Sequence, residues 1–255
     1  MQSNTFSGLF IGQKIITLAR VASTNDFLKE QLSNSKPFPE GTAIMAEIQT
    51  AGRGQAGSIW LAEPGANLTC SILLQPTFLR PSEQFWINIV VCNGICQALQ
   101  HLLGEDIRIK WPNDLLFRNQ KIAGVLIENI LQGSTWKHSI IGIGVNVNQE
   151  VFPEELHGVT SIRQILHQTY SKEKLLSEIC LFINQTYGQL KAGKLDELKT
   201  FYLNNLFAKA QKQRFLIDGV EVQGVIRDVE VTGQLLVDFQ GQHKTFGFKE
   251  IAFIL

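Results

Sequence analysis

The apolar positions up to Leu103 predict strands, a short helix and then one long helix. Ser23 is a good N-cap and the acidic Asp26 three residues later resembles a capping box, so a helix is expected to begin there. From Phe85 to Leu103, apolar residues recur alternately four and three positions apart, which is the spacing of one helix face. This long helix is expected to open at Pro81, and the expected strands cover 12–21, 42–47 and 67–75.

Between residues 107 and 204, strand signals come first and helical patterns follow. The strand runs are apolar and are separated by turn residues. The later segments place apolar residues at helical spacing. The expected strands cover 107–111, 115–117, 124–130 and 139–147, and the expected helices cover 160–170, 172–190 and 195–204.

After about residue 205 the pattern changes to short strand-like runs separated by turn dipeptides such as Asp218-Gly219. We therefore predict an α+β protein with two domains. Residues 1–205 form a mixed β-sheet backed by helices, and residues 206–255 form a small all-β, barrel-like domain with too little core to be very stable alone. The expected strands of the second domain cover 215–218, 220–229, 235–239 and 243–248.

The composition is that of an ordinary globular chain, with 44% hydrophobic residues and 23 Lys+Arg against 23 Asp+Glu among 255 residues. Zero net charge argues against non-specific nucleic-acid binding, which needs a basic face. We expect no secretory signal and no membrane span, because no run approaches about 18 apolar residues. The four cysteines contain no CxxC pair and are interpreted as buried apolar residues, so a reducing cytoplasm is the expected compartment.

The segment Gly52–Gly57 formally matches the dinucleotide-binding pattern GxGxxG. That interpretation requires a following helix and an acidic residue about 20 positions later, and this sequence offers neither. Closely spaced glycines still allow backbone N–H groups to approach an anion, and Arg53 supplies a planar fork suited to phosphate. Trp60 is positioned either to cover a flat base or to pack on the loop. The alternative is a mobile turn with a solvated arginine.

A second cluster of candidate residues follows the strand expected at 107–111. Pro112 cannot donate to a β-ladder, so Asn113 and Asp114 are expected at a strand edge or in a turn. Their side chains either bond the local backbone or, in the case of Asp114, help to hold Mg²⁺ or orient a neighbouring cation.

Two further segments combine polar residues with glycines inside strands. Lys121 leads an apolar strand and is either a solvated edge residue or a ligand contact, for which Gly124 leaves space. Residues 142–146 form a strand pattern with two glycines, and Asn146 at its end either reads an adenine edge or caps the strand.

Five segments in this order resemble the biotin protein ligase family. Each is modest alone, but the combination is specific, and the resemblance densely covers residues 12–150. The small C-terminal β domain also suits the family. The segments are Ser23-Thr24-Asn25, Gln49–Gly54 with Trp60, Lys110–Asp114, Lys121–Glu128 and Gly142–Asn148.

The resemblance implies a class II synthetase-like fold and a two-step reaction. Biotin and ATP, with Mg²⁺, first give biotinyl-5′-AMP and pyrophosphate, and the adenylate then acylates one lysine of the biotin carboxyl carrier protein of acetyl-CoA carboxylase. The chain is similar to the short members that lack an N-terminal DNA-binding domain, so no nucleic acid and no membrane is expected as a partner. A monomer or weak homodimer is expected.

The resemblance also implies roles for individual residues. Lys121, Arg53 and Asp114 are the implied catalytic residues, with Asp114 as the candidate Mg²⁺ ligand. The implied ATP contacts are Arg53, Trp60, Lys110, Asn113, Lys121 and Asn146. The implied biotin contacts are Ser23, Thr24, Asn25, Gln49, Arg53, Gly54, Gln55, Lys121 and Gly124.

The glycine-rich loop departs from the family pattern GRGRRGRxW, since Gln55, Ala56 and Ser58 replace three arginines. The lost charge predicts weaker contact with phosphate and looser retention of the adenylate. Two alternatives stay open from the sequence. One is a lipoate or octanoate ligase of the same superfamily, and the other is a non-catalytic biotin-binding regulator.

Overall fold

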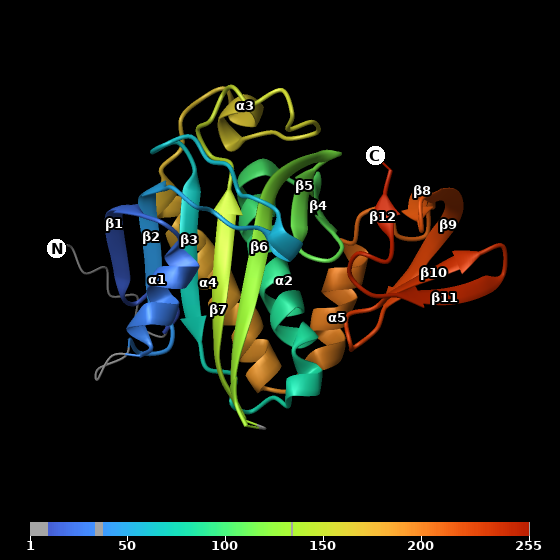
Figure 1. Ribbon diagram of the computed structural model, residues 1–255, viewed down its shortest axis with the longest axis horizontal. Helices are drawn as coiled ribbons and strands as arrows, with labels where there is room; N and C mark the ends of the chain where they lie inside the picture. Colours follow the sequence, from blue (N-terminus) through green and yellow to red (C-terminus); the bar gives the residue numbers. More distant parts are fainter. Residues whose placement is uncertain (1–9, 34–37, 134, 255) are drawn as a thin grey trace.

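The computed structural model describes residues 10–33, 38–133 and 135–254 as two β-sheets with their covering helices (Figure 1). In the larger sheet β1 pairs with β2 in parallel and every other neighbouring pair is antiparallel, which confirms the expected mixed sheet. In spatial order its strands are β1 (Ile15–Val21), β2 (Ala43–Gln49), β3 (Leu68–Leu74), β7 (Thr135–Val145), β6 (Gln120–Gln132), β5 (Asp114–Phe117) and β4 (Ile107–Lys110).

Helices cover both faces of this sheet because its strands are apolar on both sides. Ile141 packs in the main core that the sheet shares with the long helices, whereas the adjacent Ile140 packs with Leu28 on the opposite face. The short helix that carries Leu28 therefore packs on that face, opposite the long helices (Figure 1). The helices are α1 (Thr24–Gln31), α2 (Phe85–Leu103), α3 (Ile162–Leu166), α4 (Lys172–Lys191) and α5 (Leu195–Asn204).

The helix ends match the sequence expectations with three differences. Ser23 caps α1 by accepting from the backbone N–H of Asp26 at 3.4 Å, but the Asp26 carboxylate pairs with Arg53, so no capping box forms. Pro81–Glu83 forms a separate 3₁₀ turn before α2. The helix expected at 160–170 is limited to α3, which ends at His167 in a left-handed conformation (φ 56°).

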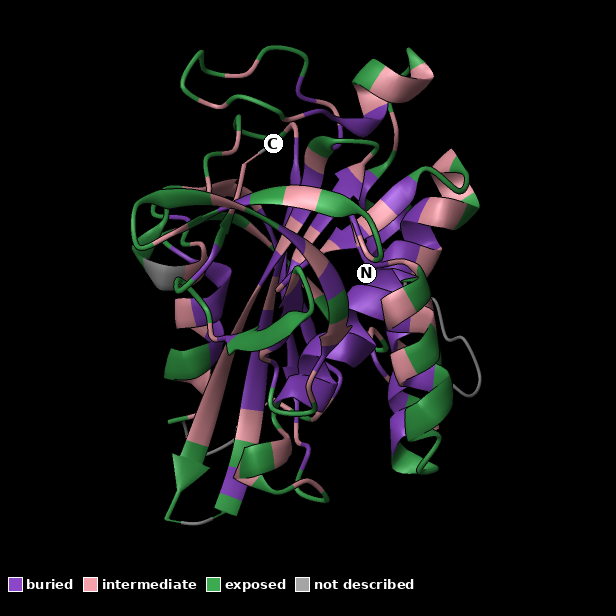
Figure 2. Cartoon of the chain, turned by 90° about the vertical axis from the view of Figure 1, so that its right-hand side faces the viewer, coloured by how far each residue is buried: buried purple, intermediate pink, exposed green. Residues whose placement is uncertain are grey.

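Helix α2 is buried on nearly every side between the sheet, α4 and α5. Buried residues gather in the interior of the molecule, where helices and strands pack together (Figure 2). With its preceding turn it spans Pro81–Leu103 and is long and apolar enough to cross a membrane, which the sequence analysis did not anticipate. In the fold, 67% of its most apolar window is buried in the protein interior. The hydropathy of this helix is therefore accounted for by the core.

The second sheet is formed by the C-terminal strands and is entirely antiparallel. Its edge strands β11 and β12 are not paired with each other among the described residues, and β12 was not anticipated from the sequence. In spatial order the strands are β11 (Gln242–Phe246), β10 (Leu235–Phe239), β9 (Val220–Val229), β8 (Lys212–Ile217) and β12 (Ala252–Phe253).

The two sheets are fastened together near the expected boundary at residue 205. The backbone of Ile109 in β4 donates to Asn205 and accepts from Phe207, so the connecting segment lies beside the large sheet. Trp111 donates its indole N–H to the carbonyl of Gly233, and its ring lies 5.3 Å from that of Phe248. The C-terminal sheet is thus held against the edge formed by β4.

Candidate active site

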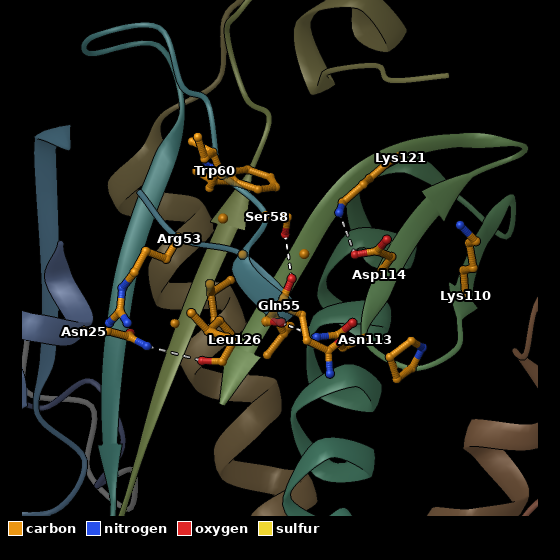
Figure 3. A pocket seen from close by; sticks show the side chains of 18 of the residues that line it. Asn25, Arg53, Gln55, Ser58, Trp60, Lys110, Asn113, Asp114, Lys121 and Leu126 are labelled. Carbon is orange, nitrogen blue, oxygen red and sulfur yellow. Dashed lines mark hydrogen bonds and ion pairs between the residues drawn. The ribbon is translucent and has the colours of Figure 1, made fainter. Parts of the chain in front are cut away.

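A pocket of about 340 Å³ opens on the α1 face of the large sheet (Figure 3). Its walls come from the loop between β2 and β3, the strands β6 and β7, and the last residues of the C-terminal sheet. Of the residues selected from the sequence, all except Asn146 line it. They are Ser23, Thr24, Asn25, Gln49, Arg53, Gly54, Gln55, Trp60, Lys110, Asn113, Asp114, Lys121 and Gly124.

The first turn of α1 supplies a polar end of the pocket. Thr24 donates its backbone N–H and its hydroxyl to Oε1 of Gln49, over 2.9 and 3.2 Å. The Ser71 hydroxyl lies 2.6 Å from both Thr24 Oγ1 and Asn25 Oδ1. Because Thr24, Asn25 and Ser71 are buried and mutually bonded, they form a preorganised set of donors and acceptors.

The other end of the pocket is cationic. Lys121 Nζ lies 2.7 Å from Asp114 Oδ1 and 5.8 Å from the centre of the Trp60 ring. A Cβ at Gly124 would lie 3.3 Å from Lys121 Nζ and from Asp114 Oδ1, so the glycine gives this pair its space. Lys121 is therefore an oriented cation inside the pocket.

Lys110 adds a second cation on β4. Its ammonium lies 5.4 Å from the centre of the Phe253 ring. Burial lowers the pKa of Lys110 from its ordinary value, and the nearby charge of Lys121 lowers it further, while Asp114 opposes the shift. The two lysines together create a region of positive potential that favours a polyanion.

Arg53, expected from the sequence as a phosphate-binding residue, is paired with two carboxylates. Its Nη2 lies 2.5 Å from Asp26 Oδ1 and 3.1 Å from Glu128 Oε2. Figure 3 shows its side chain extending towards Asn25, away from Lys121. The structure thus brings the arginine loop and the lysine strand into one pocket, but it holds their charges at different ends.

Two glycines of β7 make the pocket floor flat. A Cβ at Gly142 would lie 2.6 Å from Asn25 Oδ1, and a Cβ at Gly144 would lie within 3 Å of three ring atoms of Trp60. The indole of Trp60 therefore rests directly on the strand backbone, and its N–H has no hydrogen-bond partner among the described residues. Glycine is needed here for close approach of a ring to the sheet.

The two asparagines of the predicted ATP contacts are both buried, and they differ in position. Asn113 lines the pocket, and its side-chain amide donates to the carbonyl of Val125 in β6. Asn146 donates its amide to the carbonyl of Thr160, 3.0 Å away, and does not line the pocket. Its contacts fit the strand-capping alternative, while a direct adenine contact has no support in this geometry.

Sequence reasoning missed one whole wall of the pocket. The C-terminal segment contributes Phe248, Lys249 and Phe253, together with Ile251 and Ala252. No local signal in the sequence indicates this, because the contact depends on how the second sheet docks. The remaining lining residues were not singled out as ligand contacts, although most of them lie in the segments that carry the resemblance: Ser58, Ile59, Thr69, Cys70, Trp111, Pro112, Val125, Leu126, Gly142, Ile143 and Gly144.

The described residues contain no group of three or more His, Cys, Asp or Glu side chains that could hold a metal by themselves. Asp114 offers one carboxylate, and Lys121 already occupies one of its oxygens. Such a site fits only an ion that brings most of its ligands with it, as Mg²⁺ does when it is bound to phosphates and water.

The sequence matches the family model described as "Biotin/lipoate A/B protein ligase family" over residues 17–146. The chain is 32% identical over 181 residues to the bifunctional ligase/repressor BirA of Bacillus spizizenii, an alignment covering 69% of this chain and 54% of that protein. It is 24% identical to the biotin--[acetyl-CoA-carboxylase] ligase of Mycobacterium tuberculosis, with 90% and 85% of the two chains covered. The chain thus spans about half the length of the BirA proteins of Bacillus.

Among solved structures, the fold is similar to the biotin protein ligase from Aquifex aeolicus in complex with biotin and ATP. The TM-score is 0.78 at 26% identity, and the match covers 94% of this chain and 97% of the other. This likeness confirms the expected fold of a mixed sheet with helices, and the second antiparallel sheet is consistent with a small C-terminal domain.

Proposed function

The chain belongs to the biotin/lipoate A/B protein ligase family, and we propose on this basis that it is an ATP-dependent biotin protein ligase. The observation that carries the proposal is the pocket itself, which joins a buried hydrogen-bonding end to a cationic end. A bicyclic polar ring suits the first end and a phosphate chain suits the second. The Aquifex protein of similar fold is described with biotin and ATP bound.

In the proposed first step, a carboxylate oxygen of biotin attacks the α-phosphorus of ATP. A carboxylate–phosphorus bond forms, the bond from that phosphorus to the bridging oxygen breaks, and pyrophosphate leaves. Two anions must approach each other, so fixed positive charge lowers the barrier. Lys121 and Lys110 supply that charge, and Asp114 holds the Lys121 ammonium in place.

In the proposed second step, the uncharged amine of an acceptor lysine attacks the acyl carbon of biotinyl-AMP. An amide bond forms, the acyl–oxygen bond breaks, AMP leaves and the amine loses its proton. Lys121 stabilises the phosphate as leaving group in this step too. The proposed acceptor is the biotin carboxyl carrier domain of acetyl-CoA carboxylase, and the proposed compartment is the cytoplasm, where the buried thiols stay reduced.

Mg²⁺ is proposed as part of the ATP substrate. Asp114 is the residue that would contribute a carboxylate to it, beside phosphate oxygens and water. When bound, the ion would neutralise charge on the phosphates of the leaving group.

Biotin is favoured over lipoate by the polar end of the pocket. Thr24, Asn25 and Gln49 are polar groups that line this end of the pocket, and Ser71 supports Thr24 and Asn25 from behind. The ureido group of biotin can add hydrogen bonds to such groups, whereas the dithiolane ring of lipoate has no N–H or C=O with which to do so. A non-catalytic binder would have no need of Lys121 and Lys110 in the same pocket.

The proposal is tested by incubating the protein with ATP, labelled biotin and a purified carrier domain. The expected product is a carrier with one biotin, attached at one lysine, as measured by mass spectrometry. Attachment of lipoate in preference to biotin, or no attachment of either, would contradict it.

The lowered pKa of Lys110 predicts a specific pH dependence. Lys110 is charged only below its pKa, and that pKa is lowered. As the pH rises, kcat/KM for ATP should therefore begin to fall at a lower pH than it would with a lysine of ordinary pKa. In Lys110→Arg the charge persists, and the alkaline limb of kcat/KM for ATP should move to higher pH. The exposed Lys137→Arg is the matched control. If the alkaline limb does not move in Lys110→Arg, the charge of Lys110 does not contribute to ATP binding.

The loop sequence predicts leakage of the adenylate. Gln55 and Ser58 line the pocket at positions where the family pattern has arginine, so the phosphate loses charged donors. Gln55→Arg should slow release of biotinyl-AMP roughly tenfold, the order of one added charge-assisted hydrogen bond. Release is measured as biotinylation of a bystander protein, with Gln242→Arg on the exposed β11 as control. Wild-type protein that labels no bystander would contradict the prediction.

A further inference from the structure

Glu128 lies beside the pocket without a role in the chemistry described above. It is on β6, two residues after Leu126, which lines the pocket, so alternation along the strand turns both side chains to the same face. The side chain of Glu128 is 24% exposed, against 44% for Arg53 and 45% for Asp26. It is the least exposed of these three charged groups.

One oxygen of Glu128 joins two different parts of the pocket. Glu128 Oε2 accepts from Asn25 Nδ2 at 2.7 Å and from Arg53 Nη2 at 3.1 Å. Asn25 belongs to the first turn of α1, and Arg53 belongs to the loop that follows β2. The carboxylate therefore connects the polar end of the pocket to the loop that covers it.

The bond to Glu128 also determines which way the Asn25 amide faces. Its Nδ2 donates to Glu128 and, at 3.4 Å, to the carbonyl of Leu126, which leaves Oδ1 facing Ser71 and the floor at Gly142. Both amide hydrogens need acceptors, and an anionic acceptor holds this orientation more strongly than a neutral one. Without Glu128 the amide loses its only charged partner, and its orientation rests on the Leu126 carbonyl and the Ser71 hydroxyl alone.

Arg53 is bound to the same carboxylate, and this fixes the loop. Within the loop, Arg53 is bridged to Ile59, and Gly54 donates its N–H to the Ser58 carbonyl at 2.7 Å, so the two arms of the loop are bonded together as a hairpin. An exposed pair such as Arg53–Asp26 contributes little alone. The additional, less exposed Glu128 ties the hairpin to the central strand β6.

We propose that Glu128 is a positioning residue that couples the Asn25 amide to the Arg53 loop. The polar end of the pocket and the Arg53 loop are then ordered together, because Arg53 anchors its loop to Glu128 on β6. This inference rests on the proposed function, because the ring it serves is that of biotin. It assigns Glu128 no contact with the reacting atoms.

The test compares Glu128→Ala, Glu128→Gln, Arg53→Ala and the double variant Arg53→Ala/Glu128→Ala. Glu128→Ala should raise the biotin KM about tenfold, the order of one lost charged hydrogen bond, with kcat and the ATP KM within about twofold of wild type. Glu128→Gln keeps an acceptor for Asn25 and should recover part of the loss. The double variant should be no worse than its worse single variant, since both changes break one connection.

Controls separate this inference from the function it rests on. Glu221→Gln, at an exposed ion pair of the second sheet, should change nothing. A wild-type protein without biotin-dependent ATP–pyrophosphate exchange overturns the proposed function. If the wild type is active and both Glu128→Ala and Glu128→Gln have its biotin KM, the coupling is overturned and the proposed function is not. A lowered kcat in Glu128→Ala overturns the coupling too. So does a double variant whose change in the biotin KM is the product of the two single changes.

Discussion

Replacing Lys121 by alanine is expected to reduce biotin-dependent ATP–pyrophosphate exchange by two to three orders of magnitude, since losing one preorganised charged donor costs about 3–4 kcal/mol of barrier. The variant loses the ammonium at the cationic end and leaves the Asp114 carboxylate without its cation, 2.7 Å from where that ammonium was. An unpaired carboxylate repels phosphate and biotin carboxylate alike. The loss should therefore appear in kcat as well as in the KM for ATP.

The fold should survive Lys121→Ala, because the structural bonds of this residue are made by its backbone. Its N–H donates to the Gly158 carbonyl at 2.7 Å and its carbonyl accepts from Thr160 at 3.0 Å. Thermal unfolding close to that of the wild type is expected, and Lys137→Ala, exposed on β7, serves as the matched control. Exchange at the wild-type rate in Lys121→Ala would refute the role assigned to this lysine.

Gly144→Ala is expected to raise the KM for ATP about ten- to a hundredfold. The new methyl group would lie within 3 Å of three ring atoms of Trp60, and the strand cannot yield because Gly144 is paired with Thr69 on one side and Gly124 on the other. The indole must leave the floor, since no hydrogen bond of its N–H holds it there. Stacking of a base on an aromatic ring is worth about 1–3 kcal/mol, which sets the expected range.

Gly188→Ala provides the matched control for this substitution. Gly188 lies in α4 with nothing within 4 Å of an added Cβ, so the same chemical change there should leave both KM values unchanged. Tryptophan fluorescence should shift in Gly144→Ala and not in the control. An unchanged KM for ATP together with displaced fluorescence would show that Trp60 does not face the nucleotide.

Local features of the fold followed from the sequence because they depend on neighbours along the chain. The α5 helix and the strands β9 and β10 have the bounds that periodicity and turn residues predict. The Ser23 cap forms as expected. In contrast, the order of strands in the large sheet depends on pairings such as β3 with β7, which join segments far apart in the chain. No local pattern specifies those pairings.

The candidate site divides in the same way. The segments that resemble the family identified the pocket residues from α1, the glycine loop and β6. Three features were not predictable, because each depends on a tertiary contact: the C-terminal wall, the direction of Arg53 and the bridge through Glu128. Asn146 shows the converse, since its place in a motif suggested a ligand contact while its amide bonds the Thr160 backbone.

The most direct test of a pocket that joins a polar ring site to a phosphate site is ATP–pyrophosphate exchange with each acid in turn. The protein is incubated with ATP, Mg²⁺ and labelled pyrophosphate, with biotin, with lipoate or with neither. The account predicts label in ATP only when biotin is present, because the reverse of adenylate formation requires both ends of the pocket to be filled. Equal exchange with lipoate, or none with biotin, would contradict it.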